Sequence, residues 1–198
     1  MLFYNVITKI FKIYTKTFYK VEIKGLENLP EEGPYIIACN HKSNLDAIFV
    51  SGLINHKKLR CVSKKELFNN KILAFILDKL GVIPINRDNP DISSIKTILK
   101  VLKNKEILAI FPEGTRHKDL NSFADAKAGL GMFAIKGKAN VVPISLITNY
   151  KLFNKVTLYI DKPVDLSEYY GSKLNTDDYQ NISDNIMDII KTNYFNNK

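Results

Sequence analysis

Residues 35–46 read YIIACNHKSNLD and combine an apolar run with a polar turn. Its first part, Tyr35 to Cys39, is an unbroken apolar run, which is typical of a strand buried on both faces of a parallel sheet. Ser43 to Ile54 has the pattern of a helix, so the polar residues between the two lie where a strand ends and a helix begins. A buried strand followed at once by a helix is the repeating unit of an α/β domain.

The same alternation continues along most of the chain. Helices are predicted at residues 2–20, 71–80, 93–102 and 176–194, and strands at 21–24, 59–62, 82–85, 107–111, 141–147 and 156–160, the last as an edge strand. We therefore expect one α/β domain, with a largely parallel or mixed central sheet flanked by helices. In this organisation residues 1–20 form an amphipathic segment, and residues 21–198 form the α/β domain with its C-terminal helix.

The charge of the chain points to an anionic partner. Its 198 residues carry 29 Lys and Arg against 20 Asp and Glu, a net charge of +9. Of the basic residues only Arg60, Arg87 and Arg116 are arginines, so each is a candidate for a place that needs a planar, bidentate cation. No zinc-finger, RNP-like or basic-zipper pattern supports nucleic acid as the partner.

The two cysteines and the apolar runs bear on the compartment. Cys39 and Cys61 have no CxxC partner, which argues against a disulfide framework and favours a reducing, cytoplasmic setting. No apolar run approaches the ~20 residues that a membrane-spanning helix needs. The N-terminus lacks the pattern of a signal peptide, so we expect a protein that neither spans a membrane nor is exported.

The N-terminal segment has a wide apolar face and a basic face. At ~100° per residue, lysines gather on one side and the apolar side chains on the other, namely Leu2, Phe3, Val6, Ile7, Ile10, Phe11, Ile13, Tyr14 and Phe18. A basic, aromatic-rich amphipathic helix can lie in a membrane interface. The alternative is a helix that packs on its own domain.

The polar turn after the buried strand contains Asn40, His41 and Asp46. In open α/β sheets, sites form at the carboxyl ends of strands. The Asp46 carboxylate can hold the His41 imidazole in one tautomer and stabilise the imidazolium when His41 accepts a proton. The alternatives are structural: Asp46 could cap the helix together with Ser43, and His41 could be an ordinary hydrogen-bonded histidine.

Two further polar stretches follow apolar strands. Residues 111–116 read FPEGTR, in which Gly114 lets the backbone approach a ligand closely. Glu113 and Thr115 can hydrogen-bond hydroxyl groups, and Arg116 can bind a phosphate. Their alternative is an ordinary polar turn.

Arg87 follows the strand predicted at residues 82–85. Two of the three arginines thus come after apolar strands, which favours an anion site at that edge of the sheet. Lys127 could add to this site. Each of these cations could instead be a solvated surface side chain.

Together these stretches resemble the 1-acyl-sn-glycerol-3-phosphate acyltransferases (lysophosphatidic acid acyltransferases) and their glycerolipid relatives. Residues 40–46 match the family's N-H-x4-D motif, and residues 81–87, 111–116 and 141–144 match its second motif, its FPEGTR motif and its V-x-P strand. The four motifs come in the family's order and cover roughly residues 20–165, which is far more specific than a single HxxxxD. One departure is His117, where many members carry Ser, and it leaves details of the acceptor open.

The resemblance implies a reaction and a set of site residues. His41, oriented by Asp46, deprotonates the free hydroxyl of a lysophosphatidic acid, which attacks an acyl thioester directly and gives phosphatidic acid for phospholipid synthesis. The glycerol phosphate is held by Asn40, Arg87, Glu113, Gly114, Thr115, Arg116 and Lys127, and the strand at Val142 and Pro143 is associated with the acyl donor. No metal or cofactor is required, since acyl-ACP or acyl-CoA serves as co-substrate.

The resemblance also implies where the protein works. Its partners are an anionic membrane surface, the lysolipid substrate and, in one version, acyl carrier protein, with no role for nucleic acid. We expect a peripheral, monotopic protein at the cytoplasmic face of the cell membrane, docked through the N-terminal helix.

Other readings of the sequence stay open. The acceptor could be glycerol 3-phosphate, another lysophospholipid or a lipid A precursor. Cys39 could act as a nucleophile, since it lies two residues before His41 in a strand. A basic module that binds membranes or nucleic acid without catalysis would explain the charge and the N-terminal helix, but not the His41 and FPEGTR stretches.

Overall fold

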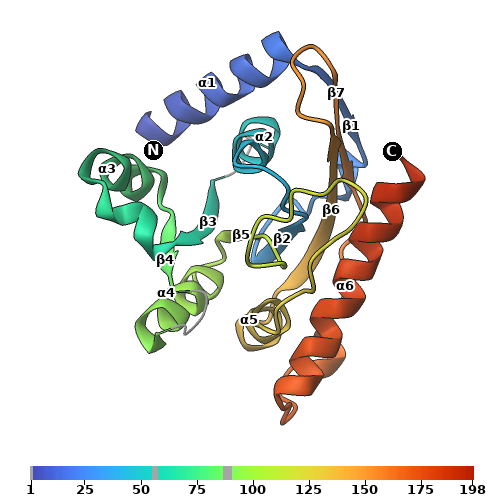
Figure 1. Ribbon diagram of the computed structural model, residues 1–198. Coiled ribbons are helices and arrows are strands. Elements are labelled where there is room, and N and C mark those ends of the chain that lie inside the picture. Colours follow the sequence, from blue (N-terminus) through green and yellow to red (C-terminus); the bar gives the residue numbers. More distant parts are fainter. Residues whose placement is uncertain (1, 55–57, 87–90) are drawn as a thin grey trace.

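The computed structural model describes residues 2–54, 58–86 and 91–198. Its seven strands form one sheet in the order β1-β7-β6-β2-β5-β3-β4 (Figure 1). The strands are β1 (Lys20–Lys24), β2 (Tyr35–Cys39), β3 (Leu59–Lys64), β4 (Ile83–Ile85), β5 (Ile107–Ile110), β6 (Asn140–Thr148) and β7 (Lys155–Ile160). Five strands run parallel to one another, whereas β7 pairs antiparallel with β6 and β1 pairs parallel with β7. The predicted α/β class with a mixed sheet is therefore confirmed.

Six α-helices surround this sheet: α1 (Leu2–Phe18), α2 (Leu45–Leu53), α3 (Lys71–Leu80), α4 (Ile92–Lys103), α5 (Gly129–Gly137) and α6 (Thr176–Asn196). Short 3₁₀ turns lie at Leu26–Asn28, Lys65–Asn69 and Ser167–Tyr169. Helices α4, α5 and α6 cover one face of the sheet, and α1 and α2 lie on the other (Figure 1).

The central strand β2 shows why the sheet needs both layers. Side chains alternate between the faces of a strand, and here Ile36 and Ala38 join the core beneath α4, α5 and α6. Tyr35, Ile37 and Cys39 join the core beneath α2. All five residues are buried, as the unbroken apolar run predicts for a strand covered on both sides.

Two details differ from the sequence-based expectation. Residues 156–160 do not form an edge strand, because β1 adds to the outer side of β7 and leaves Val156 and Leu158 fully buried. Helix α5 has no counterpart among the predicted helices, because its sequence GLGMFAIKG holds three glycines, which lower helix propensity. It is stabilised by packing: Leu130, Phe133 and Ala134 are buried in the core.

Helix α1 packs on the domain with one face and leaves apolar side chains exposed on the other. One face packs on the domain, where Tyr4, Thr8 and Thr15 are buried. The approach to α2 is close, because a Cβ added at Gly52 would lie 2.8 Å from the backbone nitrogen of Lys12. The opposite face keeps Leu2, Val6, Ile10 and Ile13 exposed to solvent. Among the described residues, no helix is both long and apolar enough to cross a bilayer.

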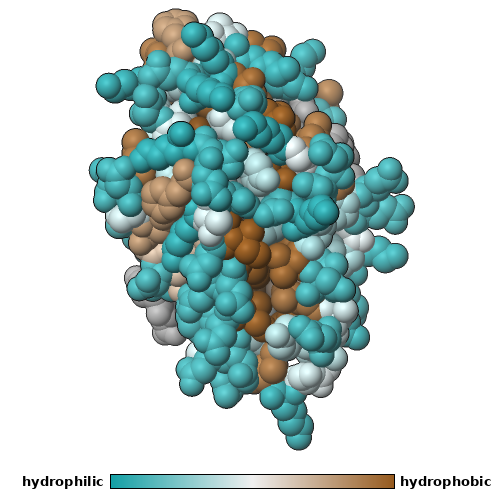
Figure 2. Space-filling view, turned by 90° about the vertical axis from the view of Figure 1, so that its right-hand side faces the viewer, coloured by the Kyte–Doolittle hydropathy of each residue, from teal (hydrophilic) through white to brown (hydrophobic). Residues whose placement is uncertain are grey.

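The side of the molecule that carries α6 and β1 has a different surface. Hydrophilic side chains cover most of it, with a smaller apolar area between them (Figure 2). Helix α6 begins with a capping box, in which the side chains of Asn175 and Asp178 each bond the other's backbone N–H. Its buried face carries Ile182, Ile186 and Ile190 into the core.

Candidate active site

His41 and Asp46 meet at the carboxyl end of β2, where the chain turns into α2. Nδ1 of His41 lies 2.9 Å from Oδ2 of Asp46. Asp46 is fully buried and His41 is 7% exposed, so their interaction takes place out of bulk water. The carboxylate can accept a hydrogen bond from the N–H at Nδ1, and in that tautomer Nε2 is the basic nitrogen of the imidazole. This is the arrangement of a general base with an orienting partner.

The same carboxylate organises the turn between β2 and α2. Oδ2 of Asp46 also accepts the backbone N–H groups of Lys42 at 2.7 Å and Ser43 at 2.8 Å. The bond to Ser43 is one half of a capping box, but the hydroxyl of Ser43 instead accepts from the N–H of Leu45. Asp46 thus bonds the backbone at the start of α2 and orients the His41 ring at the same time. The two roles are not alternatives.

The loop after β5 fixes the backbone of His41. The carboxylate of Glu113 accepts the N–H of His41, and the N–H of His117 donates to the carbonyl of His41 over 2.8 Å. The ring of Phe111 stacks on the imidazole with centroids 4.0 Å apart and an angle of 12°. The FPEGTR stretch therefore supports the base directly as well as lying beside it.

Glu113 lies deeper than a contact with substrate hydroxyls would require. Its side chain is fully buried, and one carboxylate oxygen holds the His41 backbone. Burial raises the pKa of this carboxyl group from 4.5 to about 7, although the bond from His41 and the nearby Lys42 oppose the shift. The structure thus places Glu113 as a support beneath His41, where the sequence suggested a residue that binds the acceptor.

Asn40 is likewise buried rather than facing a ligand. Its amide oxygen accepts the N–H of Leu146 at 2.8 Å, and its amide nitrogen donates to the carbonyl of Leu146 at 3.0 Å. These two bonds continue the β2–β6 ladder by one step beyond the strand. Asn40 therefore fixes the edge on which His41 stands, a different role from the substrate contact expected from the motif.

Lys42 is a buried cation that no sequence motif singles out. Its ammonium group lies 3.8 Å from the ring centroid of Phe123 and donates to the carbonyls of Asp119 and Ser122. Desolvation lowers its pKa. These contacts tie residues 119–123 to the turn that carries His41.

The last three residues of the FPEGTR stretch lie closer to the surface. Thr115 and Arg116 are exposed, and Gly114 has a φ of 67°, a conformation that favours glycine. A Cβ at Gly114 would lie 3.3 Å from the side chain of Lys127, so the expected neighbour Lys127 does come to this loop. Arg87 lies outside the described residues.

The residues expected near the acyl donor lie inside the sheet. Val142 is fully buried in β6, and Pro143 pairs in register with Ala38 of β2. Cys39, the alternative nucleophile, is 1% exposed. Burial, with the charges of Asp46 and Glu113, raises the pKa of its thiol well above the usual range. A thiol in that setting is a poor nucleophile, which argues against the Cys39 mechanism.

An apolar cavity of about 460 Å³ opens beside the base. His41, Phe111 and Arg116 line one part of it, and most of the rest is lined by α1, α2, α3 and β3, with side chains such as Phe11, Leu73 and Leu77. The volume lies in the range of small-molecule sites, roughly 300–1,000 Å³. The cavity is therefore lined by the His41 imidazole, by the Arg116 cation and by apolar side chains.

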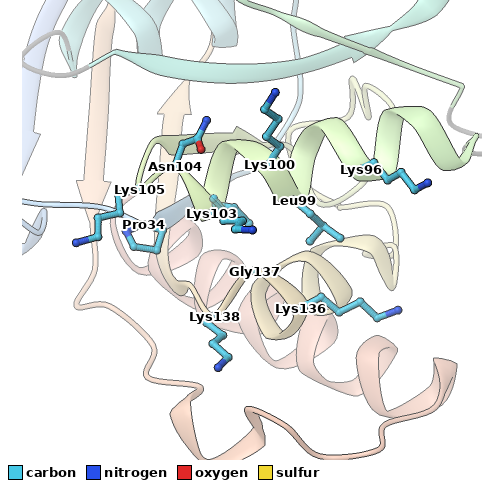
Figure 3. Close-up of a pocket in the computed structure, with 11 residues that line it drawn as sticks. Pro34, Lys96, Leu99, Lys100, Lys103, Asn104, Lys105, Lys136, Gly137 and Lys138 are labelled. Carbon is cyan, nitrogen blue, oxygen red and sulfur yellow. The ribbon is translucent and has the colours of Figure 1, made fainter.

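A larger groove of about 750 Å³ lies between α4 and α5 (Figure 3). Among the described residues that line it there is no histidine, cysteine or serine. It carries six lysines, namely Lys96, Lys100, Lys103, Lys105, Lys136 and Lys138, and no acidic residue. This groove is a basic surface rather than a reaction site.

These features define a class of enzyme. A histidine base held by a carboxylate at the strand ends, with an apolar chamber beside it, fits the transfer of an apolar group to a hydroxyl. The family model described as Acyltransferase matches residues 20–147. The chain belongs to this acyltransferase family.

Curated relatives agree with the family match. The chain is 36% identical over 154 residues to the 1-acyl-sn-glycerol-3-phosphate acyltransferase of Bacillus subtilis (strain 168), covering 75% of this chain and 76% of that protein. It is 33% identical over 187 residues to the chloroplastic 1-acyl-sn-glycerol-3-phosphate acyltransferase LPAT1 of Arabidopsis thaliana, covering 86% of this chain and 50% of that protein. The chain thus spans only half the length of the plant relative.

The fold has a counterpart among solved structures. The 1-acyl-sn-glycerophosphate (LPA) acyltransferase PlsC from Thermotoga maritima matches with a TM-score of 0.75 and 23% identity. The match covers 98% of this chain and 80% of that one. It confirms the architecture, including the N-terminal helix.

The raised pKa of Glu113 predicts a specific pH dependence of stability. In the unfolded chain this carboxyl group loses its proton near pH 4.5, but in the folded protein only near pH 7. The contribution of Glu113 to the free energy of unfolding is therefore fully present below pH 4.5. It is lost as the pH rises from 4.5 to 7. Relative to Glu113→Gln, the wild type should lose on the order of 3 kcal/mol of unfolding free energy over this window, at about 1.4 kcal/mol per pKa unit.

Urea unfolding at a series of pH values measures this difference. Glu168→Gln, at an exposed side chain, controls for the loss of one negative charge. Parallel stability curves for the wild type and Glu113→Gln between pH 4.5 and 7 would contradict the assignment.

Proposed function

We propose that this protein transfers a fatty acyl chain from an acyl thioester to the sn-2 hydroxyl of 1-acyl-sn-glycerol 3-phosphate and so makes phosphatidic acid. The observation that carries the proposal is the His41–Asp46 pair at the mouth of the apolar cavity. The names of the relatives support the choice of acceptor.

The chemistry assigned to His41 is general base catalysis. Nε2 takes the proton of the sn-2 hydroxyl while the oxygen attacks the thioester carbonyl, and Asp46 stabilises the imidazolium that forms. The tetrahedral intermediate then collapses, the C–S bond breaks, and the leaving thiolate takes the proton from His41. No acyl-enzyme forms, in agreement with the buried, unreactive state of Cys39.

The surroundings of His41 suit the two parts of the substrates. Arg116 lines the cavity at the same end as His41 and is exposed, so its guanidinium can bind the phosphate of the acceptor in a bidentate manner. Lys127, beside Gly114, adds a second cation. The leucine-rich part of the cavity between α1 and α3 suits an acyl chain.

The proposed donor is a thioester of an anionic carrier, either acyl carrier protein or coenzyme A. The net charge of +9 matches an anionic carrier of either kind.

The proposed location is the surface of an anionic membrane. On α1 the exposed apolar side chains Leu2, Val6, Ile10 and Ile13 form a continuous stripe. The stripe extends to α3, where Ile72 and Phe75 are exposed and the ring of Phe75 lies 6.2 Å from that of Phe3. Apolar surface of this kind, flanked by lysines, is typical of a helix that lies in the membrane interface.

Acyl transfer on lipid vesicles tests the function. With a palmitoyl thioester of either carrier, the wild type should convert lysophosphatidic acid to phosphatidic acid faster than it acylates glycerol 3-phosphate or a neutral monoacylglycerol. Arg116→Ala should raise KM for lysophosphatidic acid about tenfold or more, since it removes a charge-assisted bond to the phosphate.

Lys118→Ala, which removes an exposed cation two residues away, serves as the matched control and should leave KM unchanged. An unaltered KM in Arg116→Ala would remove Arg116 from the acceptor site. Failure of the wild type to make phosphatidic acid from either donor would refute the proposed reaction.

Vesicle binding tests the location. The double variant Ile10→Glu/Ile13→Glu should bind anionic vesicles at least tenfold more weakly in a sedimentation assay, because it places two charges in the apolar stripe. Ile92→Glu, at a similarly exposed isoleucine of α4, is the control and should bind like the wild type. Equal binding by all three proteins would show that α1 is not the docking element.

A further inference from the structure

Tyr150 contacts the catalytic pair from a distant part of the chain. It lies between β6 and β7, and its hydroxyl donates to Oδ1 of Asp46 over 2.6 Å. The other oxygen, Oδ2, is occupied by Nδ1 of His41 and by the backbone N–H groups of Lys42 and Ser43. Tyr150 therefore satisfies the oxygen of Asp46 that faces away from the base.

The position of this hydroxyl is tightly fixed. The ring of Tyr150 stacks on Phe49 of α2 at a centroid distance of 6.3 Å and an angle of 15°. Its backbone has a φ of 61°, which is unfavourable for a bulky residue, and its N–H donates to the hydroxyl of Thr148. An unfavourable conformation persists only where the surroundings hold it in place.

The far end of the same loop is fixed to α1. Phe153 also has a positive φ, 64°, and its N–H donates to the carbonyl of Phe18 over 2.6 Å. The rings of Phe153 and Phe18 lie 6.3 Å apart. The loop from Tyr150 to Phe153 thus spans from the end of α1 to the carboxylate of Asp46 and is held at both ends.

We propose that Tyr150 is a positioning residue, which fixes the Asp46 carboxylate so that Oδ2 stays aligned with His41. The proposal rests on the proposed function in that it takes His41 to be the base of the reaction. Without the hydroxyl, Oδ1 is a buried acceptor with no partner in the described part of the chain, and the carboxylate is free to rotate toward another donor. Rotation misaligns the imidazole, and catalysis depends on that alignment.

The protonation state of Tyr150 agrees with this role. Burial and the negative charge of Asp46 raise the pKa of the phenol far above its usual range, so the hydroxyl is a permanent donor. A tyrosine that only filled space would not need its oxygen directed at a carboxylate. Here the shortest bond that Asp46 makes is the one to Tyr150.

Tyr150→Phe tests the proposal, with Tyr35→Phe as its matched control. Tyr35 is also buried, but its hydroxyl has no hydrogen-bond partner among the described residues. In acyl transfer to lysophosphatidic acid, Tyr150→Phe should lower kcat about tenfold and leave KM within twofold. Tyr35→Phe should change neither. Loss of stability alone would move the melting temperature but not kcat of the folded enzyme.

A second measurement does not depend on activity. In proton NMR, the Nδ1–H resonance of His41, assigned by its loss in His41→Ala, should shift or broaden in Tyr150→Phe and stay in place in Tyr35→Phe. If the wild type shows no acyl transfer, the proposed function fails while this resonance still tests Tyr150. Should Tyr150→Phe not fold, Thr148→Val, which removes the brace on the Tyr150 backbone, should lower kcat by a smaller factor. Wild-type kcat together with an unmoved resonance in Tyr150→Phe would overturn the proposal.

Discussion

The rest of the site depends on the burial of one carboxylate. Asp46 has no exposed surface, and a buried charge of this kind is tolerated only when its oxygens are fully hydrogen-bonded. Three bonds come from its own turn, and the fourth comes from Tyr150, 104 residues away. The requirement to satisfy Asp46 therefore fixes the turn between β2 and α2, the tautomer of His41 and the approach of the β6–β7 loop.

The sheet provides the rigidity on which this arrangement stands. Strand β2 lies between β5 and β6. Each of these two neighbours supplies a hydrogen bond that holds a residue just after β2. From β6, the backbone of Leu146 holds Asn40, and from the loop after β5, Glu113 holds the N–H of His41. A histidine in the turn after a central strand, held from both sides, keeps one orientation, which suits the proton transfer proposed for it.

The features that the sequence predicts correctly lie in short stretches of contiguous residues. The apolar run at 35–39 and the motifs at 40–46 and 111–116 predicted the class of fold, the pair of His41 and Asp46, and the proximity of Lys127 to Gly114. The motifs do not show that Asn40 and Glu113 turn inward to hold backbone groups, because a motif gives the order of side chains but not their direction.

The roles of Tyr150 and Lys42 cannot be predicted from a motif, because their contacts are with segments 104 and about 80 residues away. The prediction that residues 156–160 form an edge strand is wrong because β1 pairs with the outer side of β7. Helix α5 is not predicted because packing in the core, not local helix propensity, stabilises it.

We propose that His41 and Asp46 act as one unit in acyl transfer. The most direct test is a double-mutant cycle of kcat/KM for lysophosphatidic acid with His41→Ala, Asp46→Asn and the double variant, each checked for folding by circular dichroism. If the two residues act together, each single variant loses about 10²–10⁴ in rate, and the double variant is no slower than His41→Ala alone. Independent losses that multiply in the double variant, or a His41→Ala enzyme as active as the wild type, would contradict the account.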